Sequence, residues 1–359
     1  MTQGPAPSPR DPLNVAVVGA GMAGIACART LMQAGHRVTL IDDNAEVGGR
    51  MATRRTEYGA FDPGVQYFTV RDPRFELALR TTATRAVRAW SASTVRVLDE
   101  LGRVLASAPP PSEPHFVAAP GMNALLALWA QPLQQADGAA QLLLQSRVTQ
   151  IETDALNPSA WQLRTEDSED GQRVIGGFER VLLALPHAQA QALLQASGLA
   201  PALREALAPV EVAPCWTLML AFPQAMQPGL YHLGPQWSAA RSTHHRISWL
   251  ARESSKPARE PIERWTVQAS PAWSARHLDD DAPRVSAKLL KGFAEITGIR
   301  ATPGFAEVRR WRYAQTQKPL GQSHLFDAPL GIGLCGDWCL GHRVEDAFVS
   351  GLELALTVA

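Results

Sequence analysis

The stretch LNVAVVGAGMAGIACARTLMQAGHRVTLIDD, residues 13–43, decides the predicted fold. An apolar run ends at Val18, a glycine-rich turn follows, apolar residues recur at helical spacing until Gly35, and a second apolar run ends at Ile41. Strand, glycine turn, helix and strand in this order form a Rossmann-like nucleotide-binding unit. The sequence therefore predicts an α/β fold built on such a domain.

The residues of this turn have separate mechanical roles in holding a dinucleotide. Gly19 makes the turn, Gly21 lets the backbone approach a diphosphate, and Gly24 lets the helix pack closely on the strand. The diphosphate would lie on the first turn of the helix at Ala23, and Asp42 would accept a hydrogen bond from a ribose hydroxyl. The motif by itself does not separate NAD from FAD.

A second glycine turn follows the second strand. Gly48, Gly49 and Arg50 place a fixed cation a few residues beyond Asp42, and arginine offers planar, bidentate donors to a phosphate. We therefore expect Gly49 and Arg50 to meet the same diphosphate. The alternative is a surface turn whose arginine is solvated.

Bulk properties favour a small-molecule partner. The 359 residues include 34 basic and 34 acidic side chains, so no excess of positive charge favours nucleic acid or an acidic membrane surface. The four cysteines are scattered, as in a reducing compartment, and no apolar run approaches about 18 residues. We expect a cytoplasmic protein whose residues 1–12 form a flexible tail rather than a signal peptide.

Six blocks follow one another along the chain: GGRMATRR (48–55), GAFDPGVQYFTVRDPRF (59–75), SWLARESSKPARE (248–260), QASPAWS (268–274), RRWRYA (309–314) and CGDWCLGHRVEDAFVSG (335–351). In sequence and in order these blocks resemble those of bacterial renalases. Renalases belong to the flavoprotein group that includes amine oxidases, phytoene desaturases and protoporphyrinogen oxidases, in which the Gly-Gly-Arg turn is characteristic. The resemblance implies non-covalent FAD as the cofactor.

The resemblance also implies two domains, each built from separated segments. A glutathione-reductase-like FAD domain would comprise residues 13–80, 121–200 and 318–359. Residues 81–120 and 201–317 would form an α+β substrate domain with an antiparallel sheet, as in p-hydroxybenzoate hydroxylase and amine oxidases.

Residue patterns predict the further elements of both domains. Strands are expected at residues 142–151, 180–186, 215–222, 246–252, 264–270 and 330–335, and helices at 201–208, 282–297 and 344–356. The tryptophan-rich strands between residues 215 and 270 would roof one side of a pocket.

The resemblance assigns flavin contacts to two groups of residues. In the first, Gly64, Val65 and Gln66 would run beside the flavin, Val148 would meet the adenine, and Ala184 would close over the nucleotide.

The second group lies near the end of the chain. Asp337 would contact the ribityl-phosphate region, and the backbone at Arg343, Val344 and Glu345 would meet the pyrimidine edge of the flavin. The N-terminus of the last helix would then provide a positive field near N1 of the ring.

The same segment suggests two other kinds of site. Cys335, Cys339 and His342 would offer zinc three ligands but no evident fourth, and the two cysteines do not have the spacing of a redox dithiol. We expect no metal site, and we expect the cysteines to be packing residues.

The implied substrates are isomers of NAD(P)H reduced at C2 or C6 of the ring. They would lose a hydride to FAD and leave as NAD(P)+, with O2 reduced to hydrogen peroxide; because hydride loss restores an aromatic ring, no general base is obligatory. Trp311 would wall the substrate ring, with Tyr313, Gln268 and Gln66 nearby. Gln268 stands where renalases often have histidine, and Glu253 stands where a related pattern has asparagine.

Other functions remain open at this stage. An amine oxidase would use the same scaffold, although a chain with four tyrosines offers little for a tyrosine cage. A desaturase or protoporphyrinogen-oxidase-like enzyme would usually have a more hydrophobic tunnel or membrane-facing patch than a mean hydropathy of -0.11 suggests. A flavin-binding protein without turnover is the third alternative, and for all of them we expect a monomer or weak homodimer.

Overall fold

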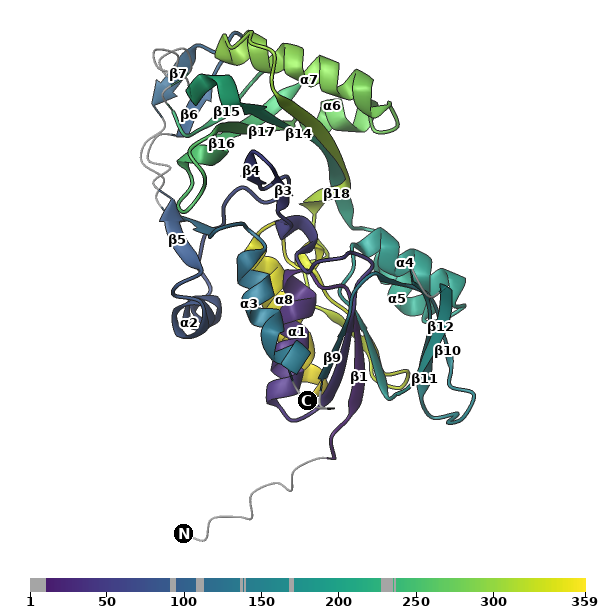
Figure 1. The fold of residues 1–359 in the computed structure, drawn as a ribbon. Helices are drawn as coiled ribbons and strands as arrows, with labels where there is room; N and C mark the ends of the chain where they lie inside the picture. The colour runs from purple at the N-terminus through teal and green to yellow at the C-terminus, as the bar shows by residue number, and fades with distance from the viewer. Residues whose placement is uncertain are drawn as a thin grey trace.

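The computed structural model describes residues 11–90, 95–107, 113–135, 138, 140–167, 171–226, 235 and 237–359. Figure 1 shows a lower body, in which helices flank a parallel sheet, and an upper body built on a second large sheet. The predicted tail lies outside the described residues except for Asp11 and Pro12.

The lower body is built around a six-stranded sheet. Its strands follow the order β19, β20, β13, β1, β2 and β9, and all except β19 run parallel to their neighbours. Their bounds are Asn14–Val18 (β1), Arg37–Ile41 (β2), Ala140–Leu143 (β9), Arg180–Leu183 (β13), Leu325–Asp327 (β19) and Ile332–Leu334 (β20). The inner strands are runs of buried apolar residues because both faces of the sheet are covered.

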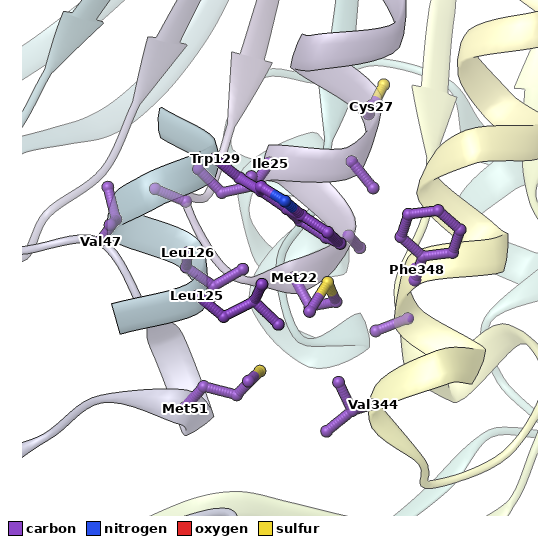
Figure 2. Close-up of a cluster of buried hydrophobic side chains, with 14 of the residues drawn as sticks. Met22, Ile25, Cys27, Val47, Met51, Leu125, Leu126, Trp129, Val344 and Phe348 are labelled. Carbon is purple, nitrogen blue, oxygen red and sulfur yellow. The ribbon is translucent and has the colours of Figure 1, made fainter. Parts of the chain in front are cut away.

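Three helices cover one face of this sheet. α1 (Met22–Gln33), α3 (Ala124–Gln135) and α8 (Val344–Val358) share an apolar core in which Met22, Leu125 and Phe348 come from different helices (Figure 2). The expected helix at 344–356 is confirmed and extends to Val358.

The other face packs against a small antiparallel sheet and two helices. The sheet consists of β10 (Ser146–Thr153), β11 (Trp161–Asp167) and β12 (Gly171–Phe178), and the helices are α4 (His187–Ala196) and α5 (Pro201–Ala206). Leu203 and Leu207 belong to this core. The predicted domain boundary at residue 201 therefore falls inside a packed unit.

The prediction of one strand over residues 142–151 is wrong. β9 ends at Leu143, and β10 begins at Ser146 in the other sheet. Between them Gln145 has a φ of 54°, a left-handed conformation that turns the chain from one sheet to the next. The strand expected at 180–186 ends at Leu183, and Pro186 precedes α4.

The upper body contains a seven-stranded sheet in the order β18, β14, β17, β16, β15, β6 and β7. All neighbours are antiparallel except β15 and β6. The bounds are Val95–Leu98 (β6), Val104–Ser107 (β7), Glu211–Phe222 (β14), Ala239–Ser242 (β15), Ile247–Arg252 (β16), Glu263–Ala269 (β17) and Phe305–Lys318 (β18). The tryptophan-rich strands expected between residues 215 and 270 are confirmed.

Two helices, α6 (Pro271–Arg276) and α7 (Ala282–Thr297), cover the upper sheet on one face (Figure 1). Trp265, Val267 and Phe293 form part of the core between them. The opposite face of the sheet looks toward the lower body, as the contacts of Gln268 and Trp311 described below establish.

The remaining elements are short. They are β3 (Arg54–Thr56), β4 (Gly59–Phe61), α2 (Pro73–Thr82), β5 (Val87–Trp90), β8 (His115–Ala118), and the single turns η1 (Gly49–Met51), η2 (Pro223–Met226), η3 (Glu253–Ser255) and η4 (Asp337–Cys339). Phe75 of α2 packs on Phe348 of α8 with ring centroids 4.9 Å apart, which fixes α2 against the lower body.

Candidate functional site

Two helices begin at the same edge of the six-stranded sheet. α1 follows β1 and α8 follows β20, and these strands run in the same direction. The helices are close enough that a Cβ on Gly351 would lie 2.1 Å from the carbonyl oxygen of Ala23. Gly21 precedes α1 without a side-chain cap, so the first N–H groups of α1, including that of Ala23, are left for an anionic ligand.

The glycine turn is shaped by close backbone contacts. Gly19 has a φ of +106°, and a Cβ there would lie 2.5 Å from the carbonyl oxygen of Ala184. A Cβ on Gly24 would lie 1.7 Å from the Gly19 carbonyl oxygen, whereas a Cβ on Gly21 would meet nothing within 4 Å. The turn is therefore tightly packed on its inner side and open at Gly21, which leaves room for a diphosphate.

Asp42 organises the adjoining loop. Its carboxylate accepts the Ala20 N–H at 2.6 Å and the Asn44 backbone and side-chain N–H groups at 2.9 and 2.8 Å. A carboxylate has about four acceptor positions, so capacity remains for a ribose hydroxyl. Val148 packs at the edge of the apolar core below this loop.

The second glycine turn lies on the first. The Gly48 N–H donates to the Ala20 carbonyl oxygen at 3.0 Å, and a Cβ on Gly49 would lie 3.2 Å from the Cα of Gly21. Val65 then donates to the Arg50 carbonyl oxygen at 2.9 Å. The segment expected beside the flavin is thereby attached to the segment expected at the diphosphate.

Arg50 and Asp337 form a bidentate ion pair across the site. Arg50 Nη1 lies 2.7 Å from Asp337 Oδ2, and Arg50 Nη2 also contacts Oδ1. Burial opposes the charge on Arg50, but the Asp337 carboxylate outweighs burial and raises the pKa of the guanidinium. Two predicted contact residues that are 287 positions apart in the chain are thus in direct contact.

His187 lies beside this pair and was not predicted. It lines one pocket with Arg50, Tyr313 and Asp337, and its Nδ1 is buried without a hydrogen-bond partner among the described residues. Burial lowers the pKa of His187, with Asp337 opposing that effect, so the imidazole is neutral near pH 7. The sequence held one indication of this role: His187 follows shortly after β13, which ends at Leu183, and so lies near the end of a parallel strand, where ligands bind in such sheets.

The first turn of α8 directs its side chains into the protein. Val344 packs in the apolar core shown in Figure 2, and Glu345 Oε2 accepts the N–H groups of Arg71 and Asp72 at 2.7 and 3.1 Å. The Arg343 N–H is occupied by Asp346 Oδ2 at 2.8 Å. The N–H groups of Val344 and Glu345 come before that of Ala347, which donates to the Arg343 carbonyl oxygen, so they have no acceptor within the helix, as the expected contact with the flavin requires.

Three predicted residues converge on the chain at Pro63 and Gly64. Gln268 Nε2 donates to the Gly64 carbonyl oxygen at 2.6 Å, and Trp311 Nε1 donates to the Pro63 carbonyl oxygen at 3.0 Å. Gln66 Nε2 also reaches the Gly64 carbonyl oxygen at 3.2 Å. Tyr313 does not join them, because it lines the pocket that contains His187. The ring centroids of Tyr313 and His187 are 6.1 Å apart.

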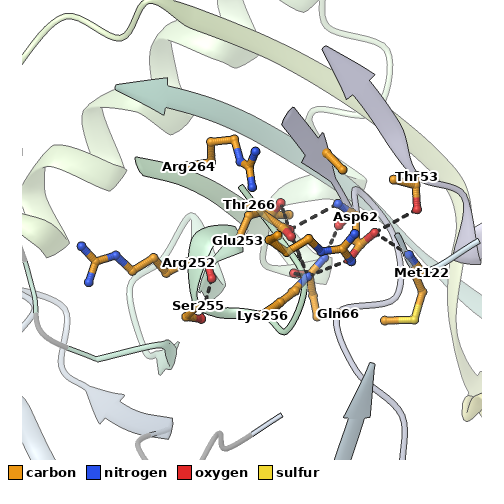
Figure 3. Close-up of polar contacts among 12 residues, drawn as sticks. Thr53, Asp62, Gln66, Met122, Arg252, Glu253, Ser255, Lys256, Arg264 and Thr266 are labelled. Carbon is orange, nitrogen blue, oxygen red and sulfur yellow. Dashed lines mark hydrogen bonds and ion pairs between the residues drawn. The ribbon is translucent and has the colours of Figure 1, made fainter. Parts of the chain in front are cut away.

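Beneath this segment lies a buried ionic cluster (Figure 3). Lys256 Nζ lies 3.0 Å from both Asp62 Oδ2 and Glu253 Oε1, and Arg259 Nη2 contacts Asp62 at 2.5 Å. All four side chains are 0% exposed. Burial raises the pKa of Asp62, but Lys256 and Arg259 outweigh it and the pKa is lowered.

This cluster changes the interpretation of Glu253. The sequence analysis noted only that Glu253 stands where a related pattern has asparagine. In the structure Thr266 Oγ1 donates to Glu253 at 2.6 Å, and the side chain is fully enclosed. Gln66 belongs partly to the same cluster, since its Oε1 accepts from Lys256 Nζ at 3.4 Å. The sequence did not predict this cluster, because Asp62 is far along the chain from Glu253, Lys256 and Arg259.

The alternative cysteine site does not form. Cys335 and Cys339 are fully buried and His342 is exposed. Contact with Cys27 and burial raise the pKa of the Cys335 thiol, and burial raises that of Cys339. Among the described residues no cluster of histidine, cysteine and acidic side chains could hold a metal.

The chain belongs to the flavin-containing amine oxidoreductase family. The family model "Flavin containing amine oxidoreductase" matches residues 110–359, and the model "NAD(P)-binding Rossmann-like domain" matches residues 17–80. FAD is therefore the cofactor, and the predicted Rossmann-like domain is confirmed. The open turn at Gly21 and the free first turns of α1 and α8 fit that cofactor.

Individual relatives match only short stretches. An L-amino-acid oxidase of Bungarus fasciatus is 55% identical over 47 residues, which are 13% of this chain and 9% of that protein. A 4,4'-diapophytoene desaturase of Staphylococcus haemolyticus is 42% identical over 60 residues, which are 17% of this chain and 12% of that protein. The matches thus span about a tenth of these relatives.

Two solved structures resemble nearly the whole chain. A putative protoporphyrinogen oxidase from Exiguobacterium sp. 255-15 has a TM-score of 0.72 and 13% identity, covering 96% of this chain and 98% of that one. Cyclohexylamine oxidase from Brevibacterium oxydans IH-35A has the same score and identity, covering 97% and 98%. At this identity the likeness shows the fold alone. Within the described part of the chain, no helix is both long and apolar enough to cross a bilayer.

Proposed function

We propose that the protein is an FAD-dependent oxidoreductase of the renalase kind, which oxidises the 2- and 6-dihydro isomers of NAD(P)H to NAD(P)+. One observation carries the proposal: the groups that converge on Gly64 are the indole of Trp311 and the amide of Gln268. Neither group exchanges a proton near neutral pH. That suits a substrate whose ring becomes aromatic on losing hydride and needs no base.

When bound, FAD would supply the redox chemistry: it would accept a hydride from the substrate, and O2 would then take up the two electrons with the proton of that hydride and one more from solvent as hydrogen peroxide. The protein's part is position and electrostatics. Trp311 offers an aromatic surface beside Gly64. Gln268 donates through its Nε2 to the Gly64 carbonyl oxygen, and among the described residues its Oε1 has no hydrogen-bond donor, so it could accept from a ring carboxamide. The first N–H groups of α8 favour negative charge on the bound ring.

A flavin-dependent amine oxidase is the second candidate. Its support is the family match together with the aromatic contact between Tyr67 and Trp249, whose ring centroids are 5.6 Å apart. An aromatic pair of this kind can line a binding site for the amine-bearing carbon of an amine as well as for a dihydropyridine ring.

One experiment separates the candidates. The purified holoprotein is mixed without oxygen with 2- and 6-dihydro-NAD(P), with ordinary NADH as the matched isomer control, and with a panel of amines, while the flavin absorbance is followed. We expect rapid bleaching by the two isomers and slow or no bleaching by NADH. Bleaching by amines but not by the isomers would favour the second candidate, and no bleaching by any compound would favour a binding protein without turnover.

A further inference from the structure

A single row of side chains crosses the upper sheet. Arg241 of β15 lies opposite Trp249 of β16, which lies opposite Gln268 of β17. Gln268 lies opposite Thr217 of β14, which lies opposite Arg309 of β18. Because directly opposed residues project from the same face of a sheet, these five side chains share one face.

This face is the one that looks toward the flavin segment. Gln268 binds the Gly64 carbonyl oxygen at 2.6 Å, and the ring of Trp249 lies 5.6 Å from that of Tyr67. The opposite face packs against α6 and α7. The row is therefore a candidate wall of the substrate pocket, with one cation at each end.

Arg309 is the end of the row that adjoins the predicted ring site. Its guanidinium carbon lies 4.3 Å from the ring centroid of Trp311, two positions along the same strand and on the same face. Trp311 is itself fixed by its 3.0 Å bond to the Pro63 carbonyl oxygen. A planar cation stacked on a fixed indole is held in place before any ligand arrives.

Arg309 forms no ion pair within the described part of the chain. A carboxylate on the same face of the sheet, Glu307, is paired with Arg54, whose Nε and Nη2 lie 3.1 and 2.9 Å from it. No hydrogen-bond acceptor or ion-pair partner for Arg309 occurs among the described residues. Burial lowers the pKa of Arg309, with Glu307 opposing and Arg54 reinforcing that effect.

We infer that Arg309 binds an anionic group of the substrate, specifically a phosphate attached through a sugar to the ring held at Trp311 and Gln268. The inference rests on the proposed function and names a specificity residue within it. Arg309 is two strands from Gln268, about 10 Å at the usual strand spacing. A nicotinamide ring, its ribose and a 5'-phosphate bridge a gap of that order, and guanidinium binds phosphate through two parallel hydrogen bonds.

The test compares two substrates that differ only in the phosphate. They are a 6-dihydro isomer of nicotinamide mononucleotide and the corresponding riboside. For Arg309→Gln we expect KM for the mononucleotide to rise about 10- to 100-fold, with kcat and the KM for the riboside little changed. Arg309→Lys keeps the charge without the planar donors, so it should recover only part of the loss.

Two further variants serve as controls. Arg312→Gln removes an exposed arginine from the same strand, where it pairs with Asp279 at 2.8 Å, and should leave both KM values unchanged. Arg241→Gln removes the other end of the row. A rise in KM with Arg241→Gln but not with Arg309→Gln would overturn the assignment to Arg309.

Failure of the inference is distinguishable from failure of the proposed function. If the wild-type protein oxidises both substrates and Arg309→Gln weakens neither or both equally, the function stands and the phosphate role is wrong. If the wild-type protein oxidises neither, binding of nicotinamide mononucleotide to the oxidised holoprotein still tests Arg309 through the flavin spectrum. Binding that is absent in the wild type, or equally tight in Arg309→Gln, would then overturn the inference.

Discussion

At the scale of single residues, the pair of Arg50 and Asp337 does two things. It neutralises a carboxylate that is only 5% exposed, and it ties the second glycine turn to Ala314 and Asp337 near the end of the chain. When a diphosphate is present, Arg50 can hold both anions because guanidinium has five N–H donors. Arg50 therefore has a structural role, and we propose that it also binds the diphosphate.

We expect Arg50→Ala to lower the affinity for FAD by about 10- to 100-fold, since one charge-assisted contact is lost and Asp337 is left unpaired. The ratio of flavin to protein absorbance after desalting measures retention. Arg55→Ala is the matched control, because Arg55 is exposed and pairs with Glu46. Full retention of FAD by Arg50→Ala would refute its role at the diphosphate.

At the scale of secondary structure, the contact between α1 and α8 depends on Gly351. A Cβ there would lie 2.1 Å from the Ala23 carbonyl oxygen and 2.8 Å from its carbon, and neither backbone atom can move without moving α1. The two helices can begin beside each other only because this position lacks a side chain.

Gly351→Val should therefore separate the helices and destabilise the protein by about 1–3 kcal/mol or more. FAD retention should fall at the same time, since the first turns of both helices would shift. Urea unfolding and the flavin-to-protein ratio measure the two effects. Leu356→Ala, on the exposed part of α8, should change neither; unchanged stability in Gly351→Val would show that the helices tolerate the displacement.

Helices and strands could be predicted from the sequence where apolar spacing and turn residues mark their bounds. The first strand, glycine turn and helix, the helix at 282–297 and the last helix follow from apolar spacing and turn residues. The break at Gln145 was missed because an apolar run does not show where a chain leaves one sheet for another.

The candidate site was predictable only in part. Motifs located Gly19, Gly21 and Arg50, but the meeting of Asp62 with Lys256, which are 194 positions apart, depends on the docking of the two bodies. The roles of His187 and Arg309 were not predicted, because the apolar spacing of a strand or helix does not show which neighbouring histidine or arginine will face a site.

At the scale of the whole molecule, the buried cluster of Asp62, Glu253, Lys256 and Arg259 joins the two bodies. Asp62 also accepts the Met122 N–H at 2.9 Å and the Thr53 hydroxyl at 3.0 Å. Charged groups enclosed in this way are favourable only while every partner is present. The cluster therefore links domain docking to the protonation of its acids.

The pH dependence follows from the lowered pKa of Asp62. Its folded pKa lies below the unfolded value of about 3.9, so its stabilisation is present above about pH 4 and is lost as pH falls toward the folded pKa. We expect the free energy of unfolding to fall less steeply below about pH 4 in Asp62→Asn than in the wild type. Asp279→Asn, at a side chain 77% exposed, should keep the wild-type slope, and identical slopes for all three proteins would contradict the prediction.

The topology also means that the nucleotide domain is completed only at the end of protein synthesis. β20 lies beside β13, and α8 lies against α1, yet the chain completes the whole upper sheet before it reaches residues 332–358. While the ribosome is still adding that part, the nucleotide domain lacks Asp337 and the second helix N-terminus. Because we propose that these residues hold FAD, we expect a nascent chain halted before residue 332 to be colourless even though its glycine turn has already been made.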